Sequence, residues 1–372
     1  MIPKAAIRAE AVRLQARIGA GAEPVEADIL LPADTLLDLY GEDIRARAYV
    51  TADPVRGEQM LRPDFTVPVV QMHMARGAGP ARYTYAGEVF RRQEVHNEAR
   101  PAEFMQVGLE VFGPVDATPK DAAHQDADVF ATLVEALSPL NLTASMGDIG
   151  LLKAALESLT LTPPRRAALM RHIWRPRRFR ALLHRFAGRV PPSPARTSLL
   201  RRLETEPAEA LVAEAGPAPG KRRAPEIVAR LNALAADAAE PPMPERDLSL
   251  IDDILSVRAA PRDALAQLYD IAVDLPAFEP AVDRMRDRLD ALEARGLALD
   301  DILFETTFGR TTLEYYDGFV FGLLAPQGTS LPPVASGGRY DALTAKLGDG
   351  RCLPAVGGVI RPNLVLAIGG GP

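Results

Sequence analysis

Apolar positions near the start of the chain recur at helical spacing. Ile7, Ala11, Leu14 and Ile18 would share one face of a helix over residues 3–18. Pro3 stands at the start of this segment, and Gly19 and Gly21 follow its end, as is typical of helix ends. The same kind of pattern predicts further helices over residues 66–75, 121–137, 279–295 and 340–347, and a short helix at the C-terminal end.

Other segments alternate apolar and polar residues with the period of a strand. Residues 81–91 and 104–112 predict a long antiparallel hairpin around a polar loop. Shorter strands are predicted at residues 24–31, 45–51, 59–62, 140–146 (ended by Gly147), 301–308, 314–324 and 353–358. Because strands and helices are grouped rather than alternating, we expect an α+β fold with a six- or seven-stranded antiparallel sheet flanked by helices.

The character of the chain changes in its middle. From residue 151 to about 244, proline and arginine are frequent and the periodicity is helical, with helices expected at residues 151–159, 165–172, 179–186 and 227–235. We therefore predict a core made of residues 1–148 and 300–372. Residues 149–299 would form a mostly helical insert with connecting helices.

Composition is that of a globular protein of more than one domain. The chain has 372 residues, of which 47% are hydrophobic and 25% charged. Its single cysteine, Cys352, excludes an internal disulfide and a CxxC metal site, and it fits a cytoplasmic protein. The N-terminus lacks the apolar run of a signal peptide, and no segment is long and apolar enough for a membrane span. The histidines lack metal-ligand spacing, so we expect neither a metal nor another cofactor.

The net charge of −6 hides one basic stretch. Between residues 158 and 203 there are 12 arginines and no acidic residue, and all of these arginines lie in residues 165–202. This stretch could be a solvated face, or it could meet an acidic partner or a phosphate-rich ligand. Aromatic residues are too sparse there for a platform that stacks bases, so binding of nucleic acid is not expected.

Three short motifs carry candidate chemistry. In the first, Asp64 and Thr66 lie two residues apart at a strand end and could both accept from an ammonium group, although Asp64 could equally cap the helix that follows. In the second, Gln106, Gly108 and Glu110 would share one face of a strand, with Gly108 leaving space for a ligand between two polar side chains.

The third motif contains adjacent tyrosines. On a strand, Tyr315 and Tyr316 would point to opposite faces, so that one packs in the core and the other offers its hydroxyl to a ligand. A glycine-containing segment, Ser336-Gly-Gly-Arg-Tyr-Asp, follows and predicts a turn into a helix.

The order of these motifs resembles the catalytic domain of histidyl-tRNA synthetase, a class II aminoacyl-tRNA synthetase. The matching segments are Arg-Pro-Asp-Phe-Thr66, Gly-Glu-Val-Phe-Arg91, the Gln106 to Glu110 strand, Leu-Glu-Tyr-Tyr316 and Pro-Ala-Val-Gly357. The chain ends about where the anticodon-binding domain of the synthetase would begin. It therefore resembles more closely the synthetase-like regulatory subunits of ATP phosphoribosyltransferase.

The resemblance implies a histidine site. Asp64, Thr66 and Gln106 would hold the α-ammonium, Glu110 and Tyr316 the imidazole nitrogens, and Arg91 the carboxylate. The complete implied set is Asp64, Thr66, Arg91, Gln106, Glu110, Tyr315 and Tyr316.

The departures from the synthetase pattern argue against adenylation. Leu364 falls where the resemblance places the arginine that clamps ATP, and Arg361 lies three positions early and is expected to point elsewhere. Thr311 falls at the other catalytic arginine, with Arg310 one place off, and Gln93 stands at a glutamate that contacts adenine. Loss of two arginines that stabilise a transferring phosphoryl group should abolish the reaction.

The resemblance thus implies a subunit with no catalytic activity of its own. It would be required by the short-form catalytic subunit of ATP phosphoribosyltransferase, a glycosyltransferase of histidine biosynthesis, and would take part in feedback inhibition by histidine. Residues 24–39 resemble the dimer-forming segment of class II synthetases, which implies a homodimer within a hetero-oligomer. Two alternatives remain: a truncated synthetase paralogue that still adenylates an amino acid, and an RNA-binding module that uses the arginine-rich stretch.

Overall fold

The computed structural model describes residues 2–40, 42–93, 100–216, 220, 222–310, 315–326, 329 and 331–369. The chain divides into two compact units. The first consists of residues 1–154 and 254–372, and the second of residues 155–253. Residues 254–299, expected in the insert, belong to the first unit, because α12 (Pro261–Asp274) packs on α13 (Glu279–Ala294) and α13 packs on α4 (Pro119–Ala136).

The first unit is built on a sheet with nine strands among the described residues. Their order is β1-β5-β6-β12-β11-β10-β7-β9-β8. The strands are β1 (Glu23–Pro24), β5 (Ala81–Phe90), β6 (Glu103–Phe112), β7 (Thr143–Asp148), β8 (Arg258–Ala259), β9 (Ile302–Glu305), β10 (Phe319–Leu324), β11 (Ala335–Arg339) and β12 (Ala355–Ile360). The predicted antiparallel centre is confirmed, but β1–β5 and β7–β9 pair in parallel. The sheet is therefore larger than expected and mixed.

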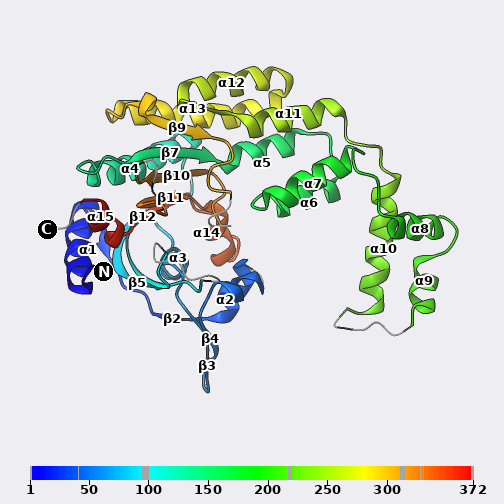
Figure 1. The fold of residues 1–372 in the computed structure, drawn as a ribbon, viewed down its shortest axis with the longest axis horizontal. Helices are drawn as coiled ribbons and strands as arrows, with labels where there is room; N and C mark the ends of the chain where they lie inside the picture. The colour runs from blue at the N-terminus through cyan, green and yellow to red at the C-terminus, as the bar shows by residue number, and fades with distance from the viewer. Residues whose placement is uncertain are drawn as a thin grey trace. The chain divides into compact units, whose positions relative to one another are not determined.

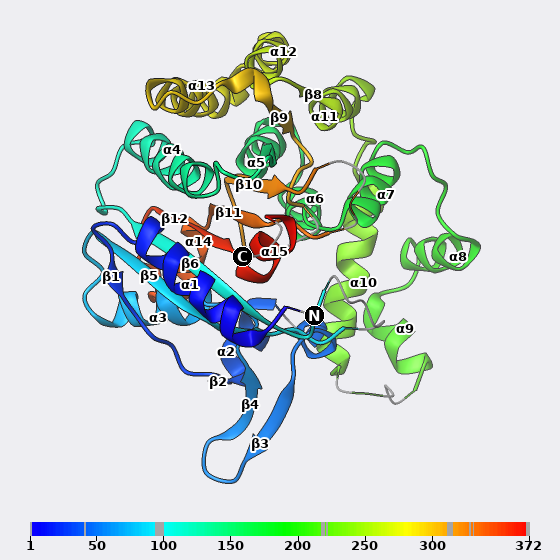
Figure 2. The same cartoon turned by 60° about the vertical axis from the view of Figure 1, so that its left-hand side comes forward.

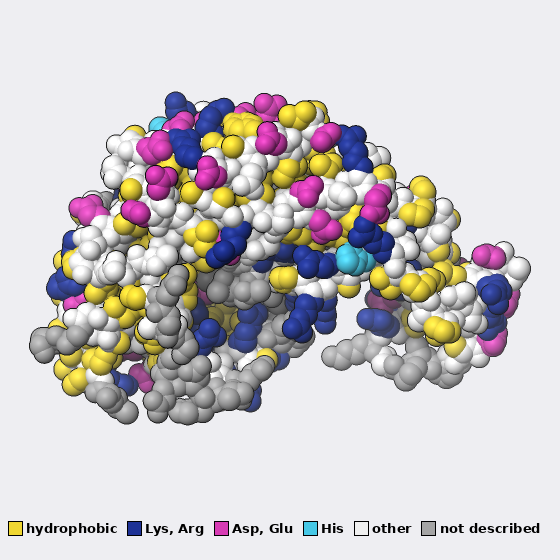
Figure 3. Space-filling model, turned by 45° about the horizontal axis from the view of Figure 1, so that its top comes forward, with side chains coloured by type: hydrophobic (Ala, Val, Ile, Leu, Met, Phe, Trp, Pro, Cys, Tyr) yellow, Lys and Arg dark blue, Asp and Glu magenta, His cyan; other side chains and the backbone are white. Residues whose placement is uncertain are grey.

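Helices cover both faces of this sheet. Helices α1 (Lys4–Ile18), α4 and α15 (Pro362–Ile368) lie together on one face (Figures 1 and 2). Helices α3 (Thr66–Ala75) and α14 (Asp341–Leu347) contact each other at the opposite face. Beyond α4, the outer surface of α12 and α13 carries interspersed acidic and basic side chains (Figure 3), such as Arg262 beside Asp290 and Glu293.

A second, three-stranded sheet has the order β2-β4-β3, with β2 (Leu30–Pro32), β3 (Val50–Asp53) and β4 (Gly57–Leu61). Helix α2 (Ala33–Tyr40) and a 3-10 turn, η1 (Glu42–Ala46), precede β3.

The continuous strand predicted over residues 24–31 is wrong, because only its two ends pair, in β1 and in β2. Between them, the carbonyl of Ala27 accepts a hydrogen bond from the Arg62 side chain and not from a neighbouring strand. The strand predicted over residues 45–51 is also wrong, because its first residues belong to the 3-10 turn and β3 begins only at Val50.

The second unit is helical among its described residues. Helix α5 (Ile149–Ser158) leads into it and α11 (Glu245–Ser256) leads out. Between them lie α6 (Pro163–Arg171), α7 (Pro176–Phe186), α8 (Pro194–Leu203), α9 (Ala208–Glu214) and α10 (Ala224–Ala239). The helical character is as predicted, although α8, α9 and α11 were not foreseen.

Part of the arginine-rich stretch is neutralised within the second unit. Arg165 and Arg196 both bind Asp237 of α10, at 2.9 and 3.2 Å. Arg202 pairs with Glu206 and Glu214, at 2.8 and 2.5 Å. Carboxylates that follow the arginine-rich stretch, from Glu206 to Asp237, therefore balance several of its charges.

A buried ion network joins five elements of the first unit, α4, α13, β11, β7 and α14. Asp126 of α4 accepts from the Nε of Arg288 on α13 and from the Nε of Arg339 at the end of β11, both at 2.9 Å. Arg288 also reaches Asp148 at 2.9 Å, and Arg339 reaches Asp341 at 2.9 Å. All but Asp341 are less than 9% exposed. This network fixes the end of β11, which immediately precedes a residue of the candidate site.

Candidate functional site

The polar residues of β6 lie on the sheet face opposite α4. Glu110 pairs with Gly357 of β12, and a Cβ on Gly357 would lie 1.6 Å from Glu110 Oε2. A Cβ on the next residue, Gly358, would meet Leu133 of α4 on the other face. The predicted sharing of one face by Gln106 and Glu110 is therefore confirmed, and Gly357 provides the room for the Glu110 carboxylate.

Three hydroxyl groups surround the Glu110 carboxylate. Thr66 Oγ1 donates to Oε1 at 2.8 Å and Tyr85 Oη donates to Oε1 at 2.9 Å, while Tyr340 Oη donates to Oε2. Burial nevertheless dominates over these hydrogen bonds and, with a smaller contribution from the charge of Asp64, raises the pKa of Glu110 to about 7. Glu110 is 1% exposed and both of its carboxylate oxygens already have hydrogen-bond donors. It therefore supports the residues around it and is not itself open to a ligand.

The space beside Gly108 is not a ligand space, contrary to the prediction. A Cβ on Gly108 would lie 2.2 Å from Cζ of Tyr85, which pairs with it across the hairpin. The glycine is needed because the Tyr85 ring crosses the strand there, stacked on Phe65 with 4.3 Å between ring centroids. The sequence analysis singled out neither Tyr85, which lies in the predicted hairpin, nor Tyr340, which lies in the segment Ser336-Gly-Gly-Arg-Tyr-Asp.

Six of the seven predicted residues line one small cavity, called here the inner pocket. They are Asp64, Thr66, Arg91, Gln106, Tyr315 and Tyr316, and they are joined by Ser336, Val359 and Arg361. Arg91 is held in place by the carbonyl of Pro63, to which its Nε donates at 2.8 Å. Segments separated by up to 300 residues thus converge on one polar cavity.

The inner pocket combines a carboxylate with an unsatisfied acceptor. Asp64 is 4% exposed, and burial raises its pKa although Arg91 and the amides of Thr66 and Val67 oppose the shift. Gln106 is 1% exposed, and its Oε1 has no hydrogen-bond partner among the described residues. A buried acceptor left without a donor is costly, so the pocket is suited to a ligand that carries N–H groups.

The two tyrosines do not lie on a strand, so the prediction that they point to opposite faces is wrong. They precede β10 in a loop, are both less than 10% exposed, and pack edge to face with 4.9 Å between ring centroids. Tyr315 Oη donates to Thr66 Oγ1 at 3.4 Å, which links the pocket wall to Glu110 through Thr66. Ser336 to Arg339 was also misread as a turn, since these residues form β11 between two neighbouring strands.

Comparisons with known proteins agree with this architecture. The family model of histidyl-tRNA synthetase matches residues 4–250 and 209–365. A protein of Brucella anthropi named ATP phosphoribosyltransferase regulatory subunit is 33% identical over 353 residues, which cover 90% of each chain. A Brucella canis protein of the same name is 33% identical over 94% of each chain. The chain belongs to the family of ATP phosphoribosyltransferase regulatory subunits.

Solved structures place this family member in the class II synthetase fold. A crystal structure from Bacillus halodurans, described as an ATP phosphoribosyltransferase regulatory subunit/histidyl-tRNA synthetase, has a TM-score of 0.67 at 21% identity and covers 99% of this chain and 80% of its own. A histidine–tRNA ligase subunit from Alicyclobacillus acidocaldarius has a TM-score of 0.58 at 27% identity and covers 98% and 93%. The predicted fold class is therefore confirmed.

The orientation of Arg361 in this regulatory-subunit chain differs from the prediction. Arg361 was expected to point away from the site, but it lines the inner pocket together with Arg91. The reason is local: its backbone stays extended, with φ −105° and ψ 98°, so the alternation of β12 continues and Val359 and Arg361 face the same side. Its guanidinium donates to the carbonyl of Pro333.

At the other departures, the described residues place no arginine in the inner pocket at the positions where the resemblance implies one. Leu364 is buried at the position implied for the clamping arginine. Arg310 is 3% exposed and is not part of the lining of the inner pocket. Thr311 lies outside the described residues.

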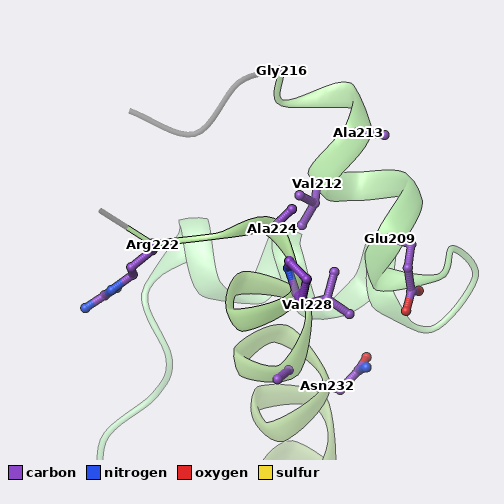
Figure 4. Close-up of a pocket in the computed structure, with 10 residues that line it drawn as sticks. Glu209, Val212, Ala213, Gly216, Arg222, Ala224, Val228 and Asn232 are labelled. Atoms are coloured by element: carbon purple, nitrogen blue, oxygen red, sulfur yellow. The ribbon is translucent and has the colours of Figure 1, made fainter. Parts of the chain in front are cut away.

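The remaining structure offers few competing sites. The second unit has an apolar pocket between α9 and α10, where Val212 and Val228 face each other while Glu209 and Arg222 lie on opposite sides (Figure 4). Within the part of the chain that the structure describes, no group of histidine, cysteine, aspartate and glutamate side chains could hold a metal ion. Across the same described residues, no helix has both the length and the apolar character needed to cross a membrane.

Proposed function

We propose that this chain is the non-catalytic regulatory subunit of a short-form ATP phosphoribosyltransferase, a glycosyltransferase of histidine biosynthesis, and that it binds histidine in the inner pocket. The chain would assemble as a homodimer with the catalytic subunit in the cytoplasm. Family membership supports the regulatory role. The observation that carries the histidine assignment is the small polar pocket in which a carboxylate, the unpaired Gln106 Oε1 and two arginines converge.

Each part of histidine has a matching group among the residues around the inner pocket. The pocket has a volume of about 10 Å³, room for a single water molecule, so its walls would have to move apart to admit histidine. Its ammonium can donate to Asp64 and Gln106, and its carboxylate can accept from Arg91 or Arg361. Tyr315 and Tyr316 would hold the imidazole ring. Glu110 would act through Thr66 and Tyr340 rather than by touching the ligand, which revises the direct imidazole contact implied by the resemblance.

Feedback inhibition would follow if histidine binds two states of the complex unequally. A ligand shifts such an equilibrium only by its difference in affinity for the two states. The loop of Tyr315 and Tyr316 is the natural moving part, because it carries pocket residues without belonging to a strand.

Replacement of Gln106 by methionine should weaken histidine binding about tenfold or more. Methionine has a similar volume but leaves a ligand N–H without its buried acceptor, which costs roughly 1–3 kcal/mol. Isothermal titration of the complex with histidine, before and after the change, measures the effect. Gln15→Met on α1 is the matched control and should bind like the parent. Absence of histidine binding by the unmodified complex, or equal affinity in both variants, would remove the assignment.

The synthetase alternative makes a different prediction. A truncated synthetase paralogue would catalyse exchange between ATP and pyrophosphate in the presence of an amino acid. We expect no such exchange with histidine, because Leu364 cannot stabilise a transferring phosphoryl group. Robust exchange with any amino acid would favour the alternative.

A further inference from the structure

Four exposed arginines of the second unit are not neutralised within it. Arg171 lies at the end of α6, and Arg177, Arg178 and Arg180 lie on the exposed side of α7, which packs on α6 (Figure 1). None of the four forms an ion pair with another described residue, unlike the arginines that bind Asp237 or Glu206. These four arginines are called here the basic face.

The basic face is unfavourable for the helix that carries it. Arg177 and Arg178 lie in the first turn of α7, which has no acidic residue, and positive charge at a helix N-terminus opposes the helix dipole. Burial lowers the pKa of His172, and the charges of three nearby guanidinium groups lower it further. They belong to Arg175, Arg178 and Arg171. A concentration of charge that the local structure disfavours is typical of a surface that binds a partner.

Single-stranded nucleic acid is a poor match for the basic face. Its bases stack on aromatic side chains, but Phe179 and Phe186 of α7 are only 0% and 3% exposed. Among the aromatic residues of this stretch, Trp174 alone is partly exposed. One tryptophan beside several arginines is the composition of the residues that contribute most to protein–protein interfaces.

The first unit carries a surface of the opposite charge. Residues 19–44 contain seven acidic residues and neither lysine nor arginine. Glu26, Asp34 and Asp38 are exposed and form no ion pair with another described residue. Asp34 and Asp38 lie four residues apart on α2 and therefore share one side of it, and Ile29 nearby in the sequence is 47% exposed. The three carboxylates are called here the acidic face.

We infer that the basic face of one copy of this chain docks on the acidic face of a second copy. Because each copy carries both faces, a two-fold axis pairs them twice and closes the assembly as a dimer. Arg177 and Arg180, three residues apart on α7, meet the carboxylates of α2, while Trp174 and Ile29 supply apolar contact. The acidic face lies within residues 24–39, so the inference rests on the proposed homodimer and names the surface that covers this segment.

Sedimentation equilibrium of the full chain, at low and at high salt, measures the dissociation constant of the dimer. Arg177→Glu should raise this constant about tenfold or more, because it places like charges opposite each other. Folding should not suffer, since glutamate is favourable in the first turn of a helix. Arg284→Glu makes the same change of charge at an exposed position on α13 and is the matched control, which should associate like the parent. The parent dimer should weaken as the salt concentration rises, and the Arg177→Glu dimer should weaken less.

Reversal of charge on both faces separates docking from a general effect of net charge. Asp38→Lys should also weaken the dimer, and Arg177→Glu combined with Asp38→Lys should restore most of the affinity, since opposite charges meet again. The inference is overturned if Arg177→Glu associates like the control, or if the combined variant associates no better than either single variant. It is also overturned if Arg177→Glu weakens binding of tRNA or of the catalytic subunit and leaves self-association unchanged. A parent chain that stays monomeric would remove the proposed homodimer as well.

Discussion

Replacement of Asp126 by asparagine is expected to destabilise the first unit by about 3–5 kcal/mol, the cost of breaking a buried ion network by removing one partner. Asp126 is 1% exposed and accepts from both Arg288 and Arg339. Asparagine has nearly the same shape as aspartate, but it presents a neutral oxygen to one guanidinium group and an NH2 group to the other, so the negative charge that balances both arginines is lost. Asp148 and Asp341 would each retain one of these arginines, so the unit should still fold.

Urea denaturation followed by circular dichroism measures this loss. Fluorescence would not serve, because the only tryptophan, Trp174, lies in the second unit. Asp128→Asn is the matched control, two residues along the same helix. Asp128 pairs with Arg295 at 2.7 Å and also with Arg82, in a partly exposed position where each such pair contributes up to about 1 kcal/mol. Equal free energies of unfolding for the two variants would show that the network does not hold α13 and β11 on α4.

Replacement of Glu110 by glutamine should make the protein less sensitive to rising pH. The pKa of Glu110 is about 7 in the folded protein and 4.5 for an ordinary glutamate, so the folded state binds the proton more tightly. Stability contributed by this proton is complete below pH 4.5, decreases as the pH rises, and is lost above pH 7. The free energy of unfolding of the parent should fall relative to that of Glu110→Gln by about 2–3 kcal/mol between pH 5 and 8.

The difference between the two proteins isolates Glu110, because other titrating groups contribute equally to both. Glu103→Gln on the same strand is the control. Glu103 lies at the exposed start of β6, paired with Lys4 at 2.7 Å, so its replacement removes a carboxylate without touching the buried cluster around Glu110. A difference for Glu110→Gln that stays flat between pH 5 and 8 would mean that the three hydroxyl groups hold the Glu110 carboxylate ionised.

The spacing of apolar residues correctly predicted helices and hairpins that are formed by residues close together in the sequence. Helix α3 has the bounds expected from its apolar run, and the hairpin of β5 and β6 follows the predicted alternation. The ranges of β7 and β10 were less accurate. Gly147 was expected to end β7, yet it pairs with Val320 inside the sheet, and a Cβ there would lie 2.6 Å from the carbonyl oxygen of Glu305. A glycine that allows close packing of chains is indistinguishable in sequence from one that breaks a strand.

The sequence likewise predicted which residues belong to the candidate site, but not where each of them lies within it. The order of motifs was enough to collect six of the residues that line the inner pocket, because that order reflects a shared fold. Position within the site was not predictable. The place of Glu110 beneath the pocket depends on Tyr85 and Tyr340, which approach it from 25 and 230 residues away. The orientation of Arg361 depends on how far β12 extends, and no periodicity marks that end.

The central claim is that this chain regulates a catalytic subunit and performs no catalysis itself. The most direct test measures phosphoribosyl transfer to ATP by a short-form catalytic subunit with and without this chain, and with added histidine. We expect activity to rise with the amount of chain added until a fixed ratio is reached, to fall when histidine is added, and to lose most of its histidine sensitivity with Gln106→Met. Equal activity of the catalytic subunit with and without the chain would contradict the claim.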